Sequence, residues 1–248
     1  MEVKVLGSVS PYSKGIHNCP GYLVSNNDTK ILLDCGNGIT RLMNIEDDLK
    51  NLTIIISHLH KDHYGELLSI GYASYVYKEL GYIKKRIPVY IPKDETADFS
   101  YLNNFGNEHF LEFIYYDETS KLTINDIKIN FSLNPHQVKT YSIRLKKDDS
   151  VLVYSGDTGY KNNSLETFAK EANLLICEST FLKGQVKKDD YHLYAYEAAL
   201  IAKKAKVYKL LLTHFWPEID KQEYVNEASS IFSNTEAAEE SKVYKLLK

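Results

Sequence analysis

The chain has 248 residues, of which 44% are hydrophobic and 25% are charged, and its formal net charge is −3. This balance is typical of a globular protein with a sizeable core, and it excludes a strongly basic chain built to bind nucleic acid over its whole surface. No apolar run approaches the roughly 18 residues that a transmembrane helix needs. We therefore predict a cytoplasmic protein without a membrane anchor, folded as a single domain over residues 1–248.

Strands dominate the predicted secondary structure of the first half. Runs rich in apolar and β-branched residues predict strands at residues 3–9, 22–25, 30–33, 52–56, 88–91 and 110–116. Helical spacing of apolar residues predicts helices at residues 39–44, 64–80 and 94–103. Four tyrosines on or just after the second helix indicate core or interface packing, and they would support a homodimer: Tyr72, Tyr75, Tyr77 and Tyr82.

The second half repeats this rhythm. Strands are predicted at residues 127–133, 142–145, 151–154, 174–177, 209–213 and 243–247. Helices are predicted at residues 164–170, 194–205 and 221–232. Strands followed by alternation with helices, in both halves, predict two sheets packed face to face with helices outside. The three cysteines are odd in number and lack CxxC spacing, which predicts free thiols at Cys19, Cys35 and Cys177.

The run Ser57-His58-Leu59-His60-Lys61-Asp62-His63 directly follows one of the buried strands. Three imidazoles and a carboxylate therefore leave a rigid strand end together, where they can converge on one point. Imidazole and carboxylate are ligands that suit zinc, manganese and iron, and a site without cysteine leaves room for a reactive water. This run predicts a metal site.

Three further candidates stand where predicted strands end. His136 follows the strand at residues 127–133, and His214 follows the strand at residues 209–213. Asp157 follows the strand at residues 151–154 within Ser155-Gly156-Asp157-Thr158-Gly159, where the glycines permit a tight turn. Each has an ordinary explanation alone, but the joint pattern favours a shared metal site.

The chain resembles the metallo-β-lactamase superfamily over nearly its whole length. The resemblance is carried by motifs in the same order as in that superfamily: His58-Leu59-His60-Lys61-Asp62-His63, His136, Asp157 and His214. The resemblance implies a four-layer αββα sandwich with a two-metal site at one edge of the sheets. It implies that His58, His60 and His136 hold one ion, that Asp62, His63 and His214 hold the other, and that Asp157 bridges them.

The resemblance also implies metal-assisted hydrolysis. A water between two divalent ions becomes hydroxide near neutral pH and acts as a nucleophile. Asp62 would orient this bridging hydroxide and accept its proton. The expected ions are zinc, with manganese and iron suited to the same ligands.

Details of the motifs point to the ribonuclease Z and phosphodiesterase branch of the superfamily. Cys177-Glu178-Ser179-Thr180-Phe181 is similar to the Glu-Ala-Thr-Phe segment of ribonuclease Z, and His192 is similar to its second catalytic histidine. In that family the carboxylate orients a histidine that stabilises the transition state or protonates the leaving oxygen. The resemblance therefore adds Glu178 and His192 to the catalytic residues. An aspartate at position 157, where β-lactamases of this fold carry cysteine, disfavours antibiotic hydrolysis.

The interval between His136 and Asp157 holds only two strands and a turn, which leaves no room for the arm with which bacterial ribonuclease Z grips tRNA. We therefore expect a dinuclear phosphodiesterase that acts on a small or nucleotide-type phosphodiester. A ribonuclease Z-type endonuclease and a lactonase or other carbonyl hydrolase stay open as alternatives. Nucleic acid is not the favoured partner. A non-catalytic binding module is disfavoured because every metal ligand of the family is present.

Overall fold

The computed structural model describes residues 1–93, 97–161, 164–187 and 190–246. Two mixed sheets of seven strands each make its centre. The first sheet consists, in spatial order, of β14 (Val243–Lys245), β1 (Glu2–Gly7), β2 (Gly21–Asn26), β3 (Thr29–Leu33), β4 (Leu52–Ile55), β5 (Ile87–Pro92) and β6 (Leu111–Tyr116). The second sheet consists of β13 (Thr235–Ala237), β12 (Lys209–Thr213), β11 (Leu174–Glu178), β10 (Ser150–Tyr154), β9 (Tyr141–Lys147), β8 (Ile127–Leu133) and β7 (Lys121–Ile124).

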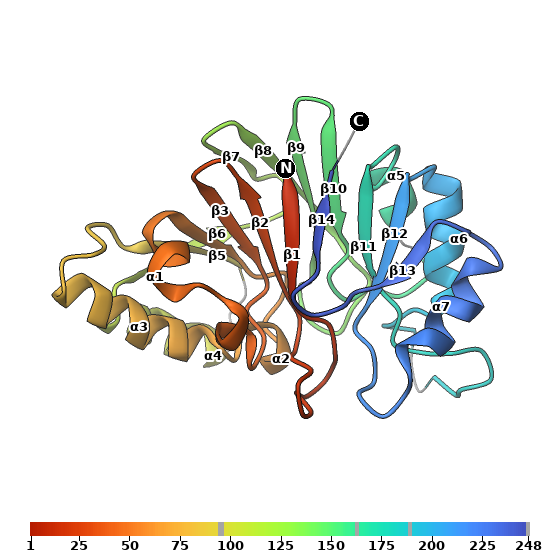
Figure 1. The fold of residues 1–248 in the computed structure, drawn as a ribbon, viewed down its shortest axis with the longest axis horizontal. Helices are drawn as coiled ribbons and strands as arrows, with labels where there is room; N and C mark the ends of the chain where they lie inside the picture. Colours follow the sequence, from red (N-terminus) through yellow and green to blue (C-terminus); the bar gives the residue numbers. More distant parts are fainter. Residues whose placement is uncertain (94–96, 162–163, 188–189, 247–248) are drawn as a thin grey trace.

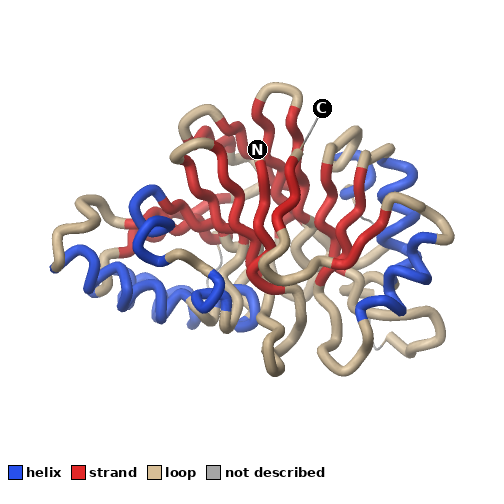
Figure 2. Tube along the Cα trace, viewed as in Figure 1, coloured by secondary structure: helices blue, strands red, loops and turns tan. Residues whose placement is uncertain are grey.

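Helices cover the outer face of each sheet, as Figures 1 and 2 show. The helices beside the first sheet are α1 (Ile45–Asp48), α2 (Lys61–Tyr64), α3 (Leu67–Glu79) and α4 (Ala97–Glu108), with 3₁₀ turns η1 (Ile39–Leu42) and η2 (Leu49–Asn51). Those beside the second sheet are α5 (Leu165–Phe168), α6 (Ala195–Ala205) and α7 (Lys221–Ser229). The predicted αββα sandwich is confirmed.

Three apolar layers hold the sandwich together, one between the sheets and one under each set of helices. Along β8, Ile127, Ile129 and Phe131 point into the layer between the sheets, whereas Lys128 and Asn130 are exposed. This alternation is expected of a strand with one solvated face. Strand β12, next to the edge strand β13, is buried on both faces, because Leu211 contacts one layer while Leu210 and Leu212 contact another. Burial on both faces explains the continuous apolar runs that precede the polar motifs.

The elements differ from the prediction at several places. The helix predicted at residues 64–80 is two helices, α2 and α3, separated around Glu66, whose carboxylate accepts hydrogen bonds from Gly38 N and Thr40 Oγ1. The helix predicted at residues 39–44 is the 3₁₀ turn η1. The short edge strands β7 and β13 were not predicted, since three or four residues carry too little of a period-two pattern.

Two predicted elements extend beyond the described residues. The helix expected from residue 94 is described from Ala97, as α4, and the strand expected at residues 243–247 is described as β14. Residues 94–96 and 247 lie outside the described part of the chain.

The structure confirms the free cysteines but differs from the prediction for the tyrosines. All three cysteines are free and buried. Tyr72, Tyr75 and Tyr82 are between 47% and 60% exposed, so core packing was the wrong expectation for these rings. In the described ranges no helix combines the length and the apolar character that crossing a membrane requires.

Candidate metal centre

The polar side chains that the sequence singled out lie at one edge of the two sheets. Strands β10, β11 and β12 run parallel, so their carboxyl ends, with Asp157, Glu178 and His214, reach the same edge. The first sheet contributes His58 and His60 after β4, and Asp62 and His63 from α2. This is the lower edge in Figure 1, away from both termini. Loops that leave rigid, buried strands can therefore hold these groups in fixed positions.

Three imidazoles form the first group of the site. His58 Nε2 lies 3.0 Å from His60 Nδ1, which lies 3.3 Å from His136 Nε2. Together with a carboxylate oxygen of Asp157, these nitrogens are within 4.8 Å of one another. Converging nitrogens at this spacing could hold one divalent ion.

A carboxylate and two imidazoles form the second group. His63 Nε2 lies 3.4 Å from His214 Nε2 and 3.5 Å from Asp62 Oδ2. His214 Nε2 lies 3.7 Å from the same carboxylate oxygen. These three residues also offer atoms within 4.8 Å of one another and could hold a second ion.

Asp157 lies between the two groups, with one oxygen toward each. Its Oδ2 is 3.5 Å from His58 Nε2, and its Oδ1 is 3.4 Å from His63 Nε2 and 3.2 Å from His214 Nε2. The side chain is buried, and within the described residues Oδ1 makes no hydrogen bond. A buried carboxylate oxygen without a donor is costly unless a cation lies beside it. The orphaned oxygen and the N/O donor set therefore fit divalent metal ions.

The protonation of the imidazoles separates the two groups. Burial lowers the pKa of His58, His60 and His136, so their nitrogens keep the lone pairs that a cation needs. Burial also opposes the charged form of His63 and His214, but Asp157 and nearby carboxylates outweigh it, and the pKa of His214 rises to about 10. A cation in the second group would take the place of these protons.

The buried carboxylate of Asp34, which belongs to neither group, holds the histidine motif of the first sheet in position. Asp34 follows β3 and accepts from His63 Nδ1 at 2.7 Å, from Ser57 N at 2.6 Å and from Tyr154 OH at 2.6 Å. These contacts hold the imidazole of His63 so that Nε2 faces Asp157.

Other ligand candidates are held in the same manner. Thr180 Oγ1 lies 2.8 Å from His214 Nδ1, and the carbonyl of Tyr191 lies 3.1 Å from His136 Nδ1. Ser10 Oγ donates to Asp62 Oδ2 at 2.5 Å. His214 and His136 are thus oriented through the ring nitrogen that faces away from the cluster, as ligating histidines usually are. Ser10 holds Asp62 through the oxygen that also lies nearest His63 and His214.

The backbone is in the left-handed region at three positions of the site. Gly156, directly before Asp157, has φ 58°, which glycine adopts without strain. His214 and Asp34 have φ values of 64° and 57°, and non-glycine residues adopt such values at a cost that often marks a functional position.

Glu178 and His192 form a pair beside the second group. Glu178 Oε1 lies 3.0 Å from His192 Nδ1, and the His192 ring stacks on the His214 ring with centroids 5.3 Å apart. Thr158 N and Leu193 N both donate to the Glu178 carboxylate. Burial opposes ionisation of Glu178, but His192 outweighs it and lowers its pKa. Because Nδ1 of His192 is hydrogen-bonded to Glu178, Nε2 is the ring nitrogen that remains to contact a substrate.

The structure brings together all nine residues predicted for the site: His58, His60, Asp62, His63, His136, Asp157, Glu178, His192 and His214. Sequence reasoning gave no role to Asp34, Ser10 or Thr180. For Asp34 a signal was present, since an aspartate directly follows a buried strand, as Asp157 nearly does. Ser10 and Thr180 are common residue types in loops and carry no comparable signal.

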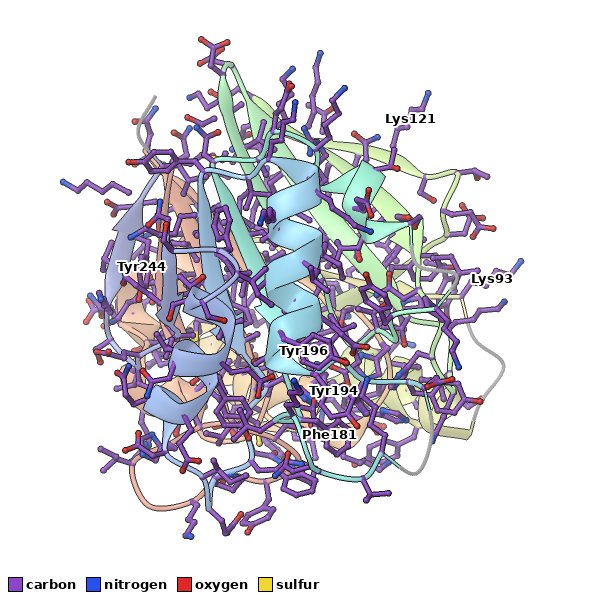
Figure 3. All side chains as sticks on the ribbon, turned by 90° about the vertical axis from the view of Figure 1, so that its right-hand side faces the viewer. Lys93, Lys121, Phe181, Tyr194, Tyr196 and Tyr244 are labelled. Atoms are coloured by element: carbon purple, nitrogen blue, oxygen red, sulfur yellow. The ribbon has the colours of Figure 1, made fainter. Side chains whose placement is uncertain are left out.

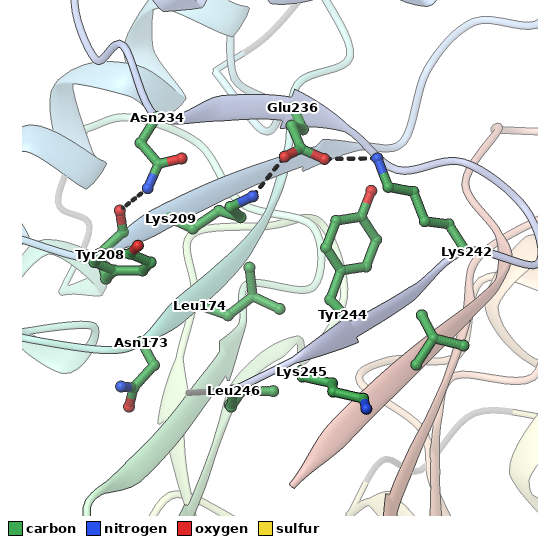
Figure 4. Close-up of a pocket in the computed structure, with 11 residues that line it drawn as sticks. Asn173, Leu174, Tyr208, Lys209, Asn234, Glu236, Lys242, Tyr244, Lys245 and Leu246 are labelled. Carbon is green, nitrogen blue, oxygen red and sulfur yellow. Dashed lines mark hydrogen bonds and ion pairs between the residues drawn. The ribbon is translucent and has the colours of Figure 1, made fainter. Parts of the chain in front are cut away.

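A cavity of about 590 Å³ lies elsewhere in the molecule (Figure 4). It is bordered by the amino-terminal ends of β11 and β12 and by β13 and β14, with Lys209, Glu236, Lys242 and Tyr244 among its lining residues. Glu236 pairs with both Lys209 and Lys242 there. No residue of the metal cluster lines this cavity.

Comparison with protein families agrees with the site geometry. A model described as a beta-lactamase superfamily domain matches residues 29–215. The probable metallo-hydrolase YhfI of Bacillus subtilis (strain 168) is 29% identical over 215 residues, which cover 86% of each chain. Ribonuclease Z of Chlamydia trachomatis serovar D is 27% identical over 292 aligned positions, which cover 95% of this chain and 94% of that enzyme.

Solved structures share the fold over the whole chain. The crystal structure of YhfI from Bacillus subtilis superimposes with a TM-score of 0.90 at 27% identity, covering 98% of both chains. The human short-form tRNase Z superimposes with a TM-score of 0.79 at 19% identity, covering both chains completely, and so shows the fold alone. The sequence likeness to ribonuclease Z, over nearly the whole length of both chains, fits the expected ribonuclease Z and phosphodiesterase branch.

Proposed function

Because the chain belongs to the beta-lactamase superfamily, we propose that it is a metal-dependent hydrolase with two divalent ions, and that it cleaves small phosphodiesters. The carrying observation is the position of Asp157, with one oxygen toward each of two ligand groups and one of these oxygens buried without a hydrogen bond from the described part of the chain. A bridging carboxylate is the arrangement that two neighbouring cations require. Likeness to a probable metallo-hydrolase supports the class of reaction.

The proposal assigns His58, His60 and His136 to one ion, Asp62, His63 and His214 to the other, and Asp157 to both. Zinc is the expected metal, since three or four N/O ligands are its usual set, and manganese or iron would fit the same donors. When bound, the ions supply positive charge that activates a water molecule and stabilises the phosphoryl oxygens.

Asp62 and His192 would move the protons of the reaction. The carboxylate of Asp62, held by Ser10, would accept a proton from the attacking water as its oxygen bonds to phosphorus. His192, held by Glu178, would donate the proton on Nε2 to the alcohol oxygen as its bond to phosphorus breaks. An alkoxide is a poor leaving group, so a phosphodiester with an alkyl ester needs this second proton transfer, and the Glu178–His192 pair would supply it.

A ribonuclease Z-type nuclease is the second candidate, favoured by the similarity to the chlamydial enzyme along nearly its whole length. Against it, β9 and β10 are joined by two residues, 148 and 149, so the interval between His136 and Asp157 offers no arm for tRNA. A lactonase is the third, because the same ions would polarise a carbonyl.

Three substrates separate the candidates when given to the metal-loaded protein: bis-p-nitrophenyl phosphate, a precursor tRNA and a γ-lactone. We expect cleavage of the small diester and little processing of the RNA. Correct trimming of the precursor tRNA would establish the second candidate, and hydrolysis of the lactone alone would establish the third.

A further inference from the structure

Two aromatic rings extend outward from the proposed proton donor. The Phe181 ring lies 6.3 Å from the His192 ring, and the Trp216 ring lies 5.4 Å from the Phe181 ring, both edge to face. Phe181 follows Glu178 by three residues, and Trp216 follows His214 by two. The strand ends that position Glu178 and His214 therefore also position these rings. We call Phe181 and Trp216 the aromatic wall.

The wall is open to solvent on one side. Trp216, the single tryptophan of the chain, is 38% exposed, and Phe181 is half-buried. The indole also lines a cavity of about 310 Å³ together with Val9 and His17, on a side of the ring where neither Phe181 nor His192 is among the lining residues. A partly exposed indole leaves part of its ring surface available to a ligand.

The neighbouring aromatic side chains are committed to other contacts. Figure 3 shows Phe181 below the first turn of α6, with Tyr194 and Tyr196 just above it. The ammonium of Lys187 lies 4.0 Å from the ring centroid of Tyr194, whose hydroxyl donates to the Gln185 carbonyl at 2.8 Å. Tyr196 stacks on Tyr194, with centroids 5.3 Å apart. Tyr194 thus secures the loop before α6, and its ring lies 6.0 Å from the Phe181 ring. The Tyr191 ring, 5.9 Å from the His136 ring, is a further aromatic neighbour of the site, whereas Phe181 and Trp216 are the pair that extends outward from His192.

We infer that the aromatic wall stacks on a planar ring carried by one ester group of the substrate, so that the preferred substrates are phosphodiesters bearing a nucleobase or aryl group. The inference rests on the proposed phosphodiesterase function. Rings of this kind bind bases through their π-faces with little regard to sequence. A planar ring stacked on the aromatic wall would bring the phosphodiester that carries it toward His192, because the His192 ring lies only 6.3 Å from the Phe181 ring.

Binding can be measured without catalysis, because Trp216 is the single tryptophan. Titration with a nucleoside 5′-monophosphate, with metal bound and after chelation, should quench its fluorescence, whereas ribose 5-phosphate should not. Phe181→Ala should weaken the quenching. Tyr208→Ala is the matched control, since Tyr208 is 70% exposed at the opposite end of β12 from His214. It should leave the titration unchanged.

Catalysis supplies the second measurement. The substrates are the methyl ester of a nucleoside 5′-monophosphate and the same diester with a methoxy group in place of the base. Trp216→Ala should lower kcat/KM for the base-carrying diester by about tenfold, as expected for one lost stacking contact, and leave the abasic diester unchanged. Trp216→Phe should restore most of the loss, and Tyr208→Ala should change neither substrate.

The outcomes separate the inference from the proposed function. Equal losses of kcat/KM on both diesters, or nucleotide titrations that leave Trp216 fluorescence unchanged, would contradict the stacking role of the aromatic wall. Neither result would contradict the proposed hydrolase function. Failure of the metal-loaded protein to cleave either diester would overturn the proposed function. In that event the titration still decides whether the wall binds planar rings.

Discussion

Asp34 Oδ2 lies 2.7 Å from His63 Nδ1, on the other side of the imidazole from Asp157. His63 therefore stands between two buried carboxylates that come from different sheets. Asp34 is completely buried and also accepts from Ser57 and Tyr154, so it ties the start of the histidine motif to the second sheet. One carboxylate outside the proposed ligand set thus orients a ligand and joins the two sheets at the site.

Replacing this carboxylate should weaken metal binding more than it disturbs the fold. We expect Asp34→Asn to lower metal affinity by about 10- to 100-fold, the usual effect of losing a partner behind a ligating histidine. Chelator competition measures the affinity, and thermal unfolding of the metal-free protein reports the fold. Asp126→Asn, at an exposed ion pair with Lys147, is the control. Unchanged affinity in Asp34→Asn would show that His63 needs no such support.

His192 should matter to turnover without holding metal. If it donates the proton to the leaving alcohol, His192→Ala should lower kcat by about 10²- to 10⁴-fold on an alkyl phosphodiester. Metal content, measured by elemental analysis, should stay at the wild-type level. The loss of kcat in His192→Ala should nearly disappear with a p-nitrophenolate leaving group, because that group needs little protonation. Loss of metal together with activity would instead make His192 a ligand.

Metal should stabilise the folded protein, because the ligand groups exist only when the two sheets are packed. Binding at a free concentration of about 1,000 Kd adds about 4 kcal/mol to the free energy of unfolding. We expect chelation to lower the Tm and to abolish phosphodiester cleavage, and zinc or manganese to restore both. His214→Ala should remove most of this stabilisation. A Tm that is insensitive to chelator and to added metal would contradict the proposed centre.

Several candidate ligands were predictable because they stand within three residues of the end of an apolar run, and such runs become buried strands. His58, Asp157 and His214 all follow this rule. The support of His63 by Asp34 was not predictable, since the two residues are 29 positions apart and come together only through the turn after β3. The aromatic wall depends equally on tertiary packing, because Phe181 and Trp216 leave different strands.

The limits of fold prediction follow from element length. The two-sided burial of β12 produced a strong apolar signal, whereas β13 has three residues and depends on pairing with β12 for its existence. The break between α2 and α3 depends on Glu66 bonding to Thr40 and Gly38, a contact that no local periodicity contains. Local patterns thus determine the layers, while long-range polar contacts determine where elements stop.

The ion pair between Glu240 and Lys221 should make stability depend on pH away from the metal centre. Glu240 Oε2 lies 2.9 Å from Lys221 Nζ, and the two side chains are 13% and 17% exposed. Burial raises the pKa of Glu240, but Lys221 outweighs it, so the folded-state pKa lies below the ordinary value. The stabilisation is therefore present above the unfolded-state pKa and is lost as the pH falls through the folded-state pKa.

Glu240→Gln removes the titrating group while preserving its shape. At pH 7 we expect the variant to be less stable by about 1.5–3 kcal/mol, the usual worth of a hydrogen bond to a charged group. This difference should shrink as the pH falls, because the wild-type carboxylate then becomes protonated and uncharged like the amide. Urea unfolding of both proteins across the acidic range measures it, with Glu46→Gln, at an exposed carboxylate, as the control. A difference that stays constant with pH would mean that the pair stabilises the fold by packing and not by charge.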